Sequence, residues 1–207
     1  AAMTMPFAVR DTNLLTGLWD AKVDLDDLVR DLVEKMFPSA PAEYAALLDL
    51  YDVKGRNEIT PEKFLRDGFF FLERMRTKLA SPEERMRWRF YALYFHQQVL
   101  ETAIDACPDN ATKIALYKDM VALLKGTKDI RIVESNQLIR TPCWGQVRSL
   151  GETDRTDRTF PDVPALEISE ERIMALYEKD RLTYPPSVST VLREPLKAAP
   201  PRAKQAR

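Results

Sequence analysis

The segment SPEERMRWRFYALYFHQQVLETAIDA, residues 81–106, predicts one long helix around which the rest of the chain packs. Ser81 can cap the helix N-terminus, Pro82 suits the first turn, and Glu84 completes a capping box. Apolar side chains then cover much of the circumference, so we expect this helix to be the most buried one. These side chains are Met86, Trp88, Phe90, Tyr91, Leu93, Tyr94, Phe95, Val99, Leu100, Ala103 and Ile104.

Further helices are expected on both sides of this segment, each beginning at a capping side chain or at a proline. They lie between Asp24 and Pro38, from Pro41 to about 51, over 61–79 after Thr60, over 111–124 after Asn110, and from Ser169 to about Asp180. Gly126 is expected to end the helix 111–124 in a left-handed conformation. The predicted fold class is all-α, with packed antiparallel helices that resemble helical-repeat proteins, an extended N-terminal arm and a proline-rich C-terminal tail.

Composition divides the chain into five segments. They are an N-terminal arm (1–21), a helical domain (22–126), an irregular linker region (127–164), a helix (165–180) and an extended docking tail (181–207). Within the linker region, residues 130–133 have the composition of one short strand. The tail contains five prolines, which disfavour regular structure.

The overall composition excludes several classes of function. The chain of 207 residues carries 31 basic and 32 acidic residues, so no net positive charge recruits nucleic acid. Its six glycines form neither a GxGxxG nor a GxxxxGK[ST] loop, which excludes the glycine-rich phosphate-binding motifs. No apolar run approaches the ~20 residues of a transmembrane helix. Cys107 and Cys143 are interpreted as two reduced, half-buried thiols, with a disulfide as the alternative.

The sequence assembles no catalytic or metal-binding constellation. His96 is the only histidine and lies in the middle of the apolar segment, with no cysteine at ligand spacing. A general base needs an orienting partner, which the sequence does not place, so His96 is predicted to be a packed or hydrogen-bonded core residue. A basic band over residues 74–89 is interpreted as a solvated face, or as a contact for an acidic partner protein. We therefore expect no enzyme activity, no catalytic residue, no metal and no cofactor.

A loop over residues 52–63 resembles the EF-hand family across about thirteen residues. Asp52 occupies the first ligand position, Ile59 the apolar eighth position, and Phe64 follows the loop. The departures are Lys54 at the third position, Arg56 at the fifth, Lys63 at the twelfth, and Asn57 in place of the glycine. Calcium needs several negatively charged oxygen ligands, so the resemblance implies a degenerate helix–loop–helix without bound calcium. The alternative is an ordinary helix–loop–helix with coincidental spacing.

The C-terminal tail is the predicted partner-binding site. Its prolines pre-set an extended backbone, which lowers the entropy lost on docking. Between Arg193 and Arg207 five basic residues face one acid, Glu194, giving a net charge of +4. The residues expected to bind a partner are Leu182, Tyr184, Val188, Val191, Leu192, Arg193, Leu196, Lys197, Arg202 and Lys204.

In general design, a small helical body with long extensions, the chain resembles supernumerary subunits of mitochondrial energy-transducing complexes. This resemblance implies a non-catalytic accessory subunit of an ATP synthase or respiratory-chain complex, on the matrix side of the inner membrane, held by protein partners. The chain begins AAMTMPF, which is compatible with a removed targeting segment or a trimmed sequence. The alternatives are a cytoskeletal or axonemal scaffold with a degenerate EF-hand, a calcium-responsive regulator, and an enzyme.

Overall fold

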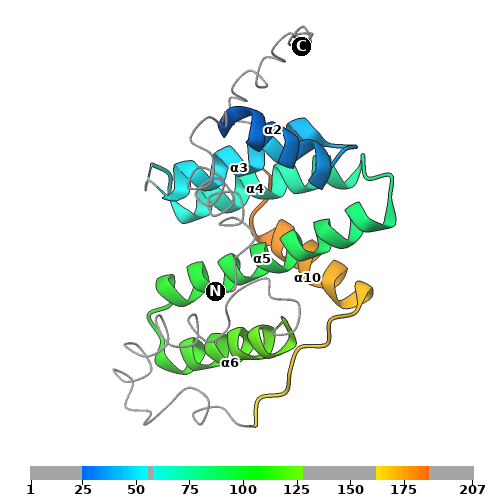
Figure 1. Ribbon diagram of the computed structural model, residues 1–207. Helices are drawn as coiled ribbons and strands as arrows, with labels where there is room; N and C mark the ends of the chain where they lie inside the picture. Colours follow the sequence, from blue (N-terminus) through cyan, green and yellow to red (C-terminus); the bar gives the residue numbers. More distant parts are fainter. Residues whose placement is uncertain (1–24, 56–57, 128–161, 187–207) are drawn as a thin grey trace, which may run out of the picture.

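A computed structural model describes residues 25–55, 58–127 and 162–186 of the chain (Figure 1). In these residues the fold is all-α, as predicted, with no strand. The helices are α2 (Leu25–Met36), α3 (Pro41–Gly55), α4 (Pro61–Arg76), α5 (Pro82–Ala106), α6 (Asn110–Thr127) and α10 (Glu170–Thr183). None of these described helices combines the length and the apolar character that a membrane crossing requires.

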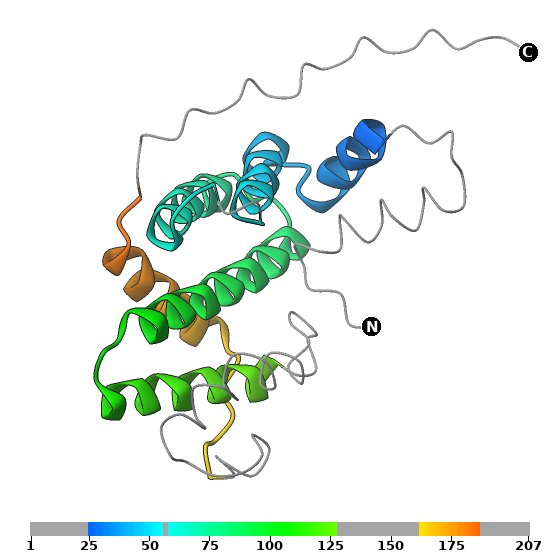
Figure 2. The ribbon, with the colours of Figure 1, turned by 90° about the vertical axis from the view of Figure 1, so that its left-hand side faces the viewer.

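Helix α5 lies at the centre of the helical body, as its apolar circumference predicts. It packs against α4, α6 and α10, while α3 packs against α4 and α2 against α3. Figure 2 shows α5 between α6 on one side and the α3–α4 pair on the other. Phe95 and Leu72 are completely buried and Leu100 nearly so, which confirms the predicted core.

The helix starts follow the local signals in the sequence. The side chain of Thr60 accepts a hydrogen bond from the backbone of Lys63, and Pro61 opens α4. Ser81 and Glu84 form the predicted capping box at the start of α5, with hydrogen bonds of 3.1 and 3.0 Å. These bonds satisfy N–H groups that have no partner within the helix.

Helix α6 begins one residue earlier than expected. Asp109, rather than Asn110, caps it, because the backbone N–H of Thr112 donates to Asp109 Oδ2 at 2.7 Å. The backbone oxygen of Asp109 also accepts from Lys113 at 2.9 Å. Adjacent Asp and Asn residues are almost equivalent as caps, so the sequence alone favours neither.

Gly126 does not end α6 in a left-handed conformation, because the helix continues to Thr127. Instead, Gly126 leaves room for the segment around Leu166, which packs against α6. A Cβ atom at this position would lie 2.3 Å from the carbonyl oxygen of Leu166. The backbone N–H of Leu166 donates to the carbonyl of Ala122 at 2.8 Å. Glycine therefore allows residues 162–169 to lie close against α6 before α10 begins.

A second glycine brings α4 and α5 together. A Cβ atom at Gly68 would lie 2.0 Å from the ring of Phe95, so the ring occupies the space that a side chain would need. The same ring stacks on Phe64 with centroids 5.2 Å apart and tilts against Phe69 at 5.5 Å. The centre of the core is thus an aromatic cluster that interlocks the two helices.

Several predicted features lie outside the described residues: the N-terminal arm, the short strand at 130–133 and Cys143. Cys107 is a free, half-buried thiol at the end of α5.

Helix α4 ends at Arg76, three residues before the predicted end. Helix α10 follows its Ser169 cap as predicted and extends to Thr183, so residues 181–183 are helical rather than extended.

Candidate interaction site at helix α10

Helix α10 reaches the central helices from a distant part of the sequence. Its apolar face contributes Ile173 and Tyr177 to the main core. Three polar contacts accompany this burial: Tyr177 with Glu73, Asp180 with His96, and Glu170 with Arg89. We call Glu73, Trp88 and His96, together with Tyr177 and Asp180, the α10 seat.

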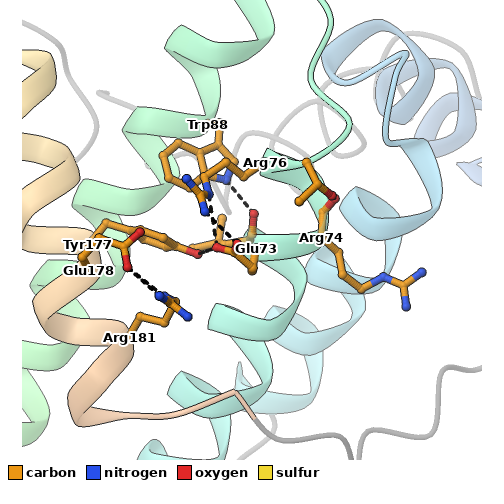
Figure 3. A network of polar contacts seen from close by, with 9 residues as sticks. Glu73, Arg74, Arg76, Trp88, Tyr177, Glu178 and Arg181 are labelled. Atoms are coloured by element: carbon orange, nitrogen blue, oxygen red, sulfur yellow. Dashed lines mark hydrogen bonds and ion pairs between the residues drawn. The ribbon is translucent and has the colours of Figure 1, made fainter.

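Figure 3 shows Tyr177 of α10 turned toward Glu73 and Trp88. Its hydroxyl donates to Glu73 Oε2 at 2.9 Å, and its ring meets Trp88 edge-on with centroids 4.8 Å apart. Arg76 holds the same carboxylate through two hydrogen bonds of 2.7 and 3.2 Å. The indole N–H of Trp88 donates to the carbonyl of Leu72 at 2.8 Å, which fixes the ring that receives Tyr177.

The charges in the α10 seat favour the Glu73 carboxylate as the acceptor of the hydrogen bond from Tyr177. The two hydrogen bonds from Arg76 lower the pKa of Glu73, and the bond from Tyr177 adds to this effect. Partial burial raises the pKa but does not outweigh these bonds. Burial and the hydrogen bond to Glu73 raise the pKa of the Tyr177 hydroxyl well above its ordinary value. Glu73 is therefore ionised and Tyr177 protonated at neutral pH, which is the combination that a charge-assisted hydrogen bond requires.

His96 and Asp180 form a second, deeper contact. The Nδ1 atom of His96 lies 2.7 Å from Asp180 Oδ2, and both side chains are buried. This confirms that His96 is a hydrogen-bonded core residue. Asp180 is the orienting partner that the sequence did not place. No hydroxyl or thiol among the described residues bonds to His96, so the pair lacks the third group of a nucleophilic triad there.

The basic band at the end of α4 and the start of α5 is engaged within the chain itself. Arg74 and Lys78 bind Glu43, Arg76 binds Glu73, Arg89 binds Glu170, and Arg85 and Arg87 donate to the backbone oxygens of Ala80 and Met36. Figure 3 shows the Arg74 side chain turned away from Tyr177. These cations fasten α2, α3 and α10 to the α4–α5 corner, which weakens the interpretation of the band as a contact for an acidic partner.

The predicted tail residues are placed only in part. Leu182 lies on the last turn of α10 and is 75% exposed. Tyr184 is half-buried and packs against the core. The other eight lie outside the described residues: Val188, Val191, Leu192, Arg193, Leu196, Lys197, Arg202 and Lys204.

Two basic residues of the EF-hand-like segment lie in the flanking helices. Lys54 belongs to α3 and donates to Gln98 on α5, whereas Lys63 belongs to α4 and donates to Asp67 of the same helix at 2.6 Å. Arg56 and Asn57 lie outside the described residues. Within the described ranges, no three His, Cys, Asp or Glu side chains gather as a metal site would need.

Comparisons with known proteins give no relatives: no family model, no curated protein and no solved structure matches this chain.

Sequence reasoning identified the last helix but missed its contacts with the core. Tyr177 and Asp180 are the residues that it missed. A signal was present, because Ile173, Tyr177 and Asp180 recur at helical spacing and place two large side chains and one acid on the same face. A lone buried histidine also implies an unassigned polar partner elsewhere in the chain.

Proposed function

We propose that this protein is a non-catalytic accessory subunit of a larger protein assembly, joined to its neighbours by the C-terminal tail. The observation that carries the proposal is the way α10 ends. The α10 seat fixes the helix by Tyr177 and Asp180, and the exposed Leu182 follows within one turn. The tail therefore leaves the body from a rigid point, which reduces the conformational entropy that docking costs.

The use of the polar groups inside the body supports a structural role. The half-buried Glu73 and the buried Glu84 and His96 each bind other groups of the body, and these bonds join segments that are distant in sequence. In an enzyme, such groups would converge on a space for substrate. Here each bond connects one part of the helical body to another.

More specifically, we propose a place in a mitochondrial ATP synthase or respiratory-chain complex, on the matrix side of the inner membrane. This rests on the general design of a small helical body with extensions, and its partners are protein subunits rather than nucleic acid. A cytoskeletal or axonemal scaffold is the second class, supported by the EF-hand-like connection between α3 and α4.

Affinity purification of the tagged full chain from its native cells distinguishes these classes. Co-purifying inner-membrane subunits support the first class, and co-purifying tubulin supports the second. A chain without residues 187–207 retains α10 and should unfold at nearly the same temperature as the full chain, but should fail to enter the assembly. Normal incorporation of the shortened chain would contradict a docking role for the tail.

A matched pair of substitutions refines the same test. Leu182 and Met86 are both exposed apolar residues of the described part of the chain, and only Leu182 lies close in sequence to residues 187–207. We expect Leu182→Ala to reduce incorporation and Met86→Ala to leave it unchanged. Equal effects of the two substitutions would contradict the role given to Leu182.

A further inference from the structure

Residues 162–186, which we call the strap, are attached to the helical body at two places. The first part lies along α6, where the backbone N–H of Leu166 donates to the carbonyl of Ala122 at 2.8 Å. In the same region, Lys125 Nζ donates to the carbonyl of Val163 at 2.6 Å. The second part is α10, which packs against α5 through the α10 seat. Figure 2 shows the strap, drawn in yellow to orange, passing from α6 to α5.

The body keeps a continuous core when the strap is set aside. Among the buried residues of the main core in the described part of the chain, only Ile173 and Tyr177 belong to α10, and the others lie between Val33 and Leu124. Helices α2 to α6 also pack against one another in sequence order. Segments that add little to the shared core can open without global unfolding. The strap is therefore suited to leave the body as one unit.

Release of the strap would uncover the body side of the α10 seat, which consists of Glu73, Trp88 and His96. The Tyr177 ring contacts the rings of Trp88 and Phe69, which are only 2% and 0% exposed. Glu73, in contrast, is already partly exposed. Water can replace the polar partners of the seat but not its ring contacts. The uncovered seat is therefore an apolar patch beside polar groups, the kind of surface that binds another protein segment.

The contacts of the α10 seat define which helix it accepts. Ile173 enters the core, and the hydroxyl of Tyr177 donates to Glu73. Asp180 bonds to His96. Of the seven tyrosines in the chain, only Tyr177 has an apolar residue four positions before it and an acid three positions after it. The strap is thus the segment of this sequence that fits the seat, whether it comes from the same chain or from a second copy.

We propose that the strap exchanges between two copies of this chain, so that the body of each copy receives α10 of the other. Every contact of the strap is retained in such a dimer, so the two forms differ mainly in chain entropy. The connecting residues 128–161 are long enough, since 34 residues span up to about 110 Å when extended. Helix α5, with 25 residues, is only about 38 Å long. The connection can therefore reach the seat of an adjacent copy.

This exchange goes beyond the role proposed for the C-terminal tail and does not depend on it. In the dimer, the chain that follows Leu182 would leave from the seat of the other copy instead of from its own body. One dimer would then present two tails, each starting from a fixed helix.

Cross-linking with a carbodiimide tests the exchange in the full-length chain. Arg89→Lys introduces an amine beside Glu170, and the carbodiimide joins these two side chains through an amide bond. Unlabelled and heavy-isotope-labelled chains of this variant are mixed in equal amounts, unfolded, and refolded together. The protein concentration reaches about 1 mM, which is comparable with the effective concentration of a flexible tether. Monomer and dimer fractions are then separated, cross-linked and analysed by mass spectrometry.

We expect the cross-link between position 89 and Glu170 to join one light and one heavy peptide in half of all cases in the dimer fraction, and in none in the monomer fraction. The cross-link between Lys78 and Glu43, both within the body, is the matched control and should always join peptides of the same isotope. Dimers in which both cross-links behave like the control would overturn the proposal, because they associate through another surface. The absence of a dimer at this concentration would overturn it as well.

Hydrogen exchange of the unmodified full-length chain tests the release of the strap itself. We expect the amides of α10 to exchange at least about tenfold faster than those in the middle of α5, because opening of the strap leaves α5 folded. Equal protection of the two helices would overturn the release of the strap as a unit, on which the exchange depends.

Discussion

Glu84 and Asp67 are two buried carboxylates with different surroundings, and each is only 1% exposed. Glu84 accepts four hydrogen bonds: from the backbone and hydroxyl of Ser39 at 2.8 and 2.9 Å, and from the backbones of Ala80 and Ser81 at 3.1 and 3.0 Å. Among the described residues, Asp67 accepts one bond, from Lys63, and its buried Oδ1 atom has no partner there.

The difference shows that burial alone does not measure what a polar group contributes. The four donors around Glu84 replace the water that the carboxylate loses and join the α2–α3 turn to the α4–α5 turn. Asp67 loses its water without an equivalent replacement, because its partner Lys63 is half-exposed. We therefore regard the α4–α5 corner as a fixed point of the fold and the Asp67 site on α4 as a local energetic cost.

The sharpest test of this comparison is Glu84→Gln, which keeps the shape and removes the charge. The new NH₂ group can take the position of Oε1, which leaves the backbone N–H of Ser39 unsatisfied, while the amide oxygen keeps the other three donors. We expect a loss of about 1–3 kcal/mol in the free energy of unfolding, which is the cost of one buried unsatisfied group. Urea denaturation with an unchanged midpoint would show that the four bonds do not stabilise the corner.

The same variant carries a pH dependence. Burial raises the pKa of Glu84, but the bonds from Ser39, Ser81 and Ala80 outweigh it, so the folded-state pKa lies below the ordinary value of 4.5. The folded protein then binds fewer protons than the unfolded chain. The contribution of Glu84 is complete above the unfolded pKa and is lost as the pH falls through the folded one. Wild type should lose more unfolding free energy than Glu84→Gln between neutral pH and pH ~3.

Tyr177→Phe tests the α10 seat and should have an intermediate effect. The substitution removes the hydrogen bond to Glu73 but keeps the ring contacts with Trp88 and Phe69. Because Glu73 keeps its two bonds from Arg76, we expect a loss of about 0.5–1.5 kcal/mol. The variant should also show faster amide exchange in α10 than wild type, while exchange in α4 and α5 is unchanged. Equal acceleration in all three helices would argue against a local role.

Asp67→Asn should have the smallest effect and completes the comparison. The variant removes a buried charge that has one partner, and a half-exposed Lys63 can turn to solvent. We expect the free energy of unfolding to change by less than about 1 kcal/mol. A loss as large as that of Glu84→Gln would show that Asp67 is stabilised by contacts other than its bond to Lys63.

The parts of the fold that the sequence predicted are those with local causes. Thr60, Ser81 and Ser169 cap helices through bonds to backbone three residues away, so their effect is visible in a short window. The central place of α5 was also predictable, because apolar side chains around most of a helix require neighbours on every side.

The rest depends on contacts between distant residues. Nothing near His96 indicates that its partner is Asp180, 84 positions further along the chain. Gly126 looked like a helix terminator because the return of Leu166 along α6 is not visible in the local pattern. Tertiary packing decided both.

The long connection to α10 has a consequence for how the chain folds during synthesis. Helices α2 to α6 contact their neighbours in sequence, whereas Tyr177 reaches Glu73 across 104 positions. Synthesis proceeds at about 5–20 residues per second, so the about fifty residues between Thr127 and Tyr177 take roughly 3–10 s. During that interval Trp88 and Phe69 have no Tyr177 to cover them. We expect the nascent chain to be most vulnerable to aggregation, and most in need of a chaperone, at this stage of translation.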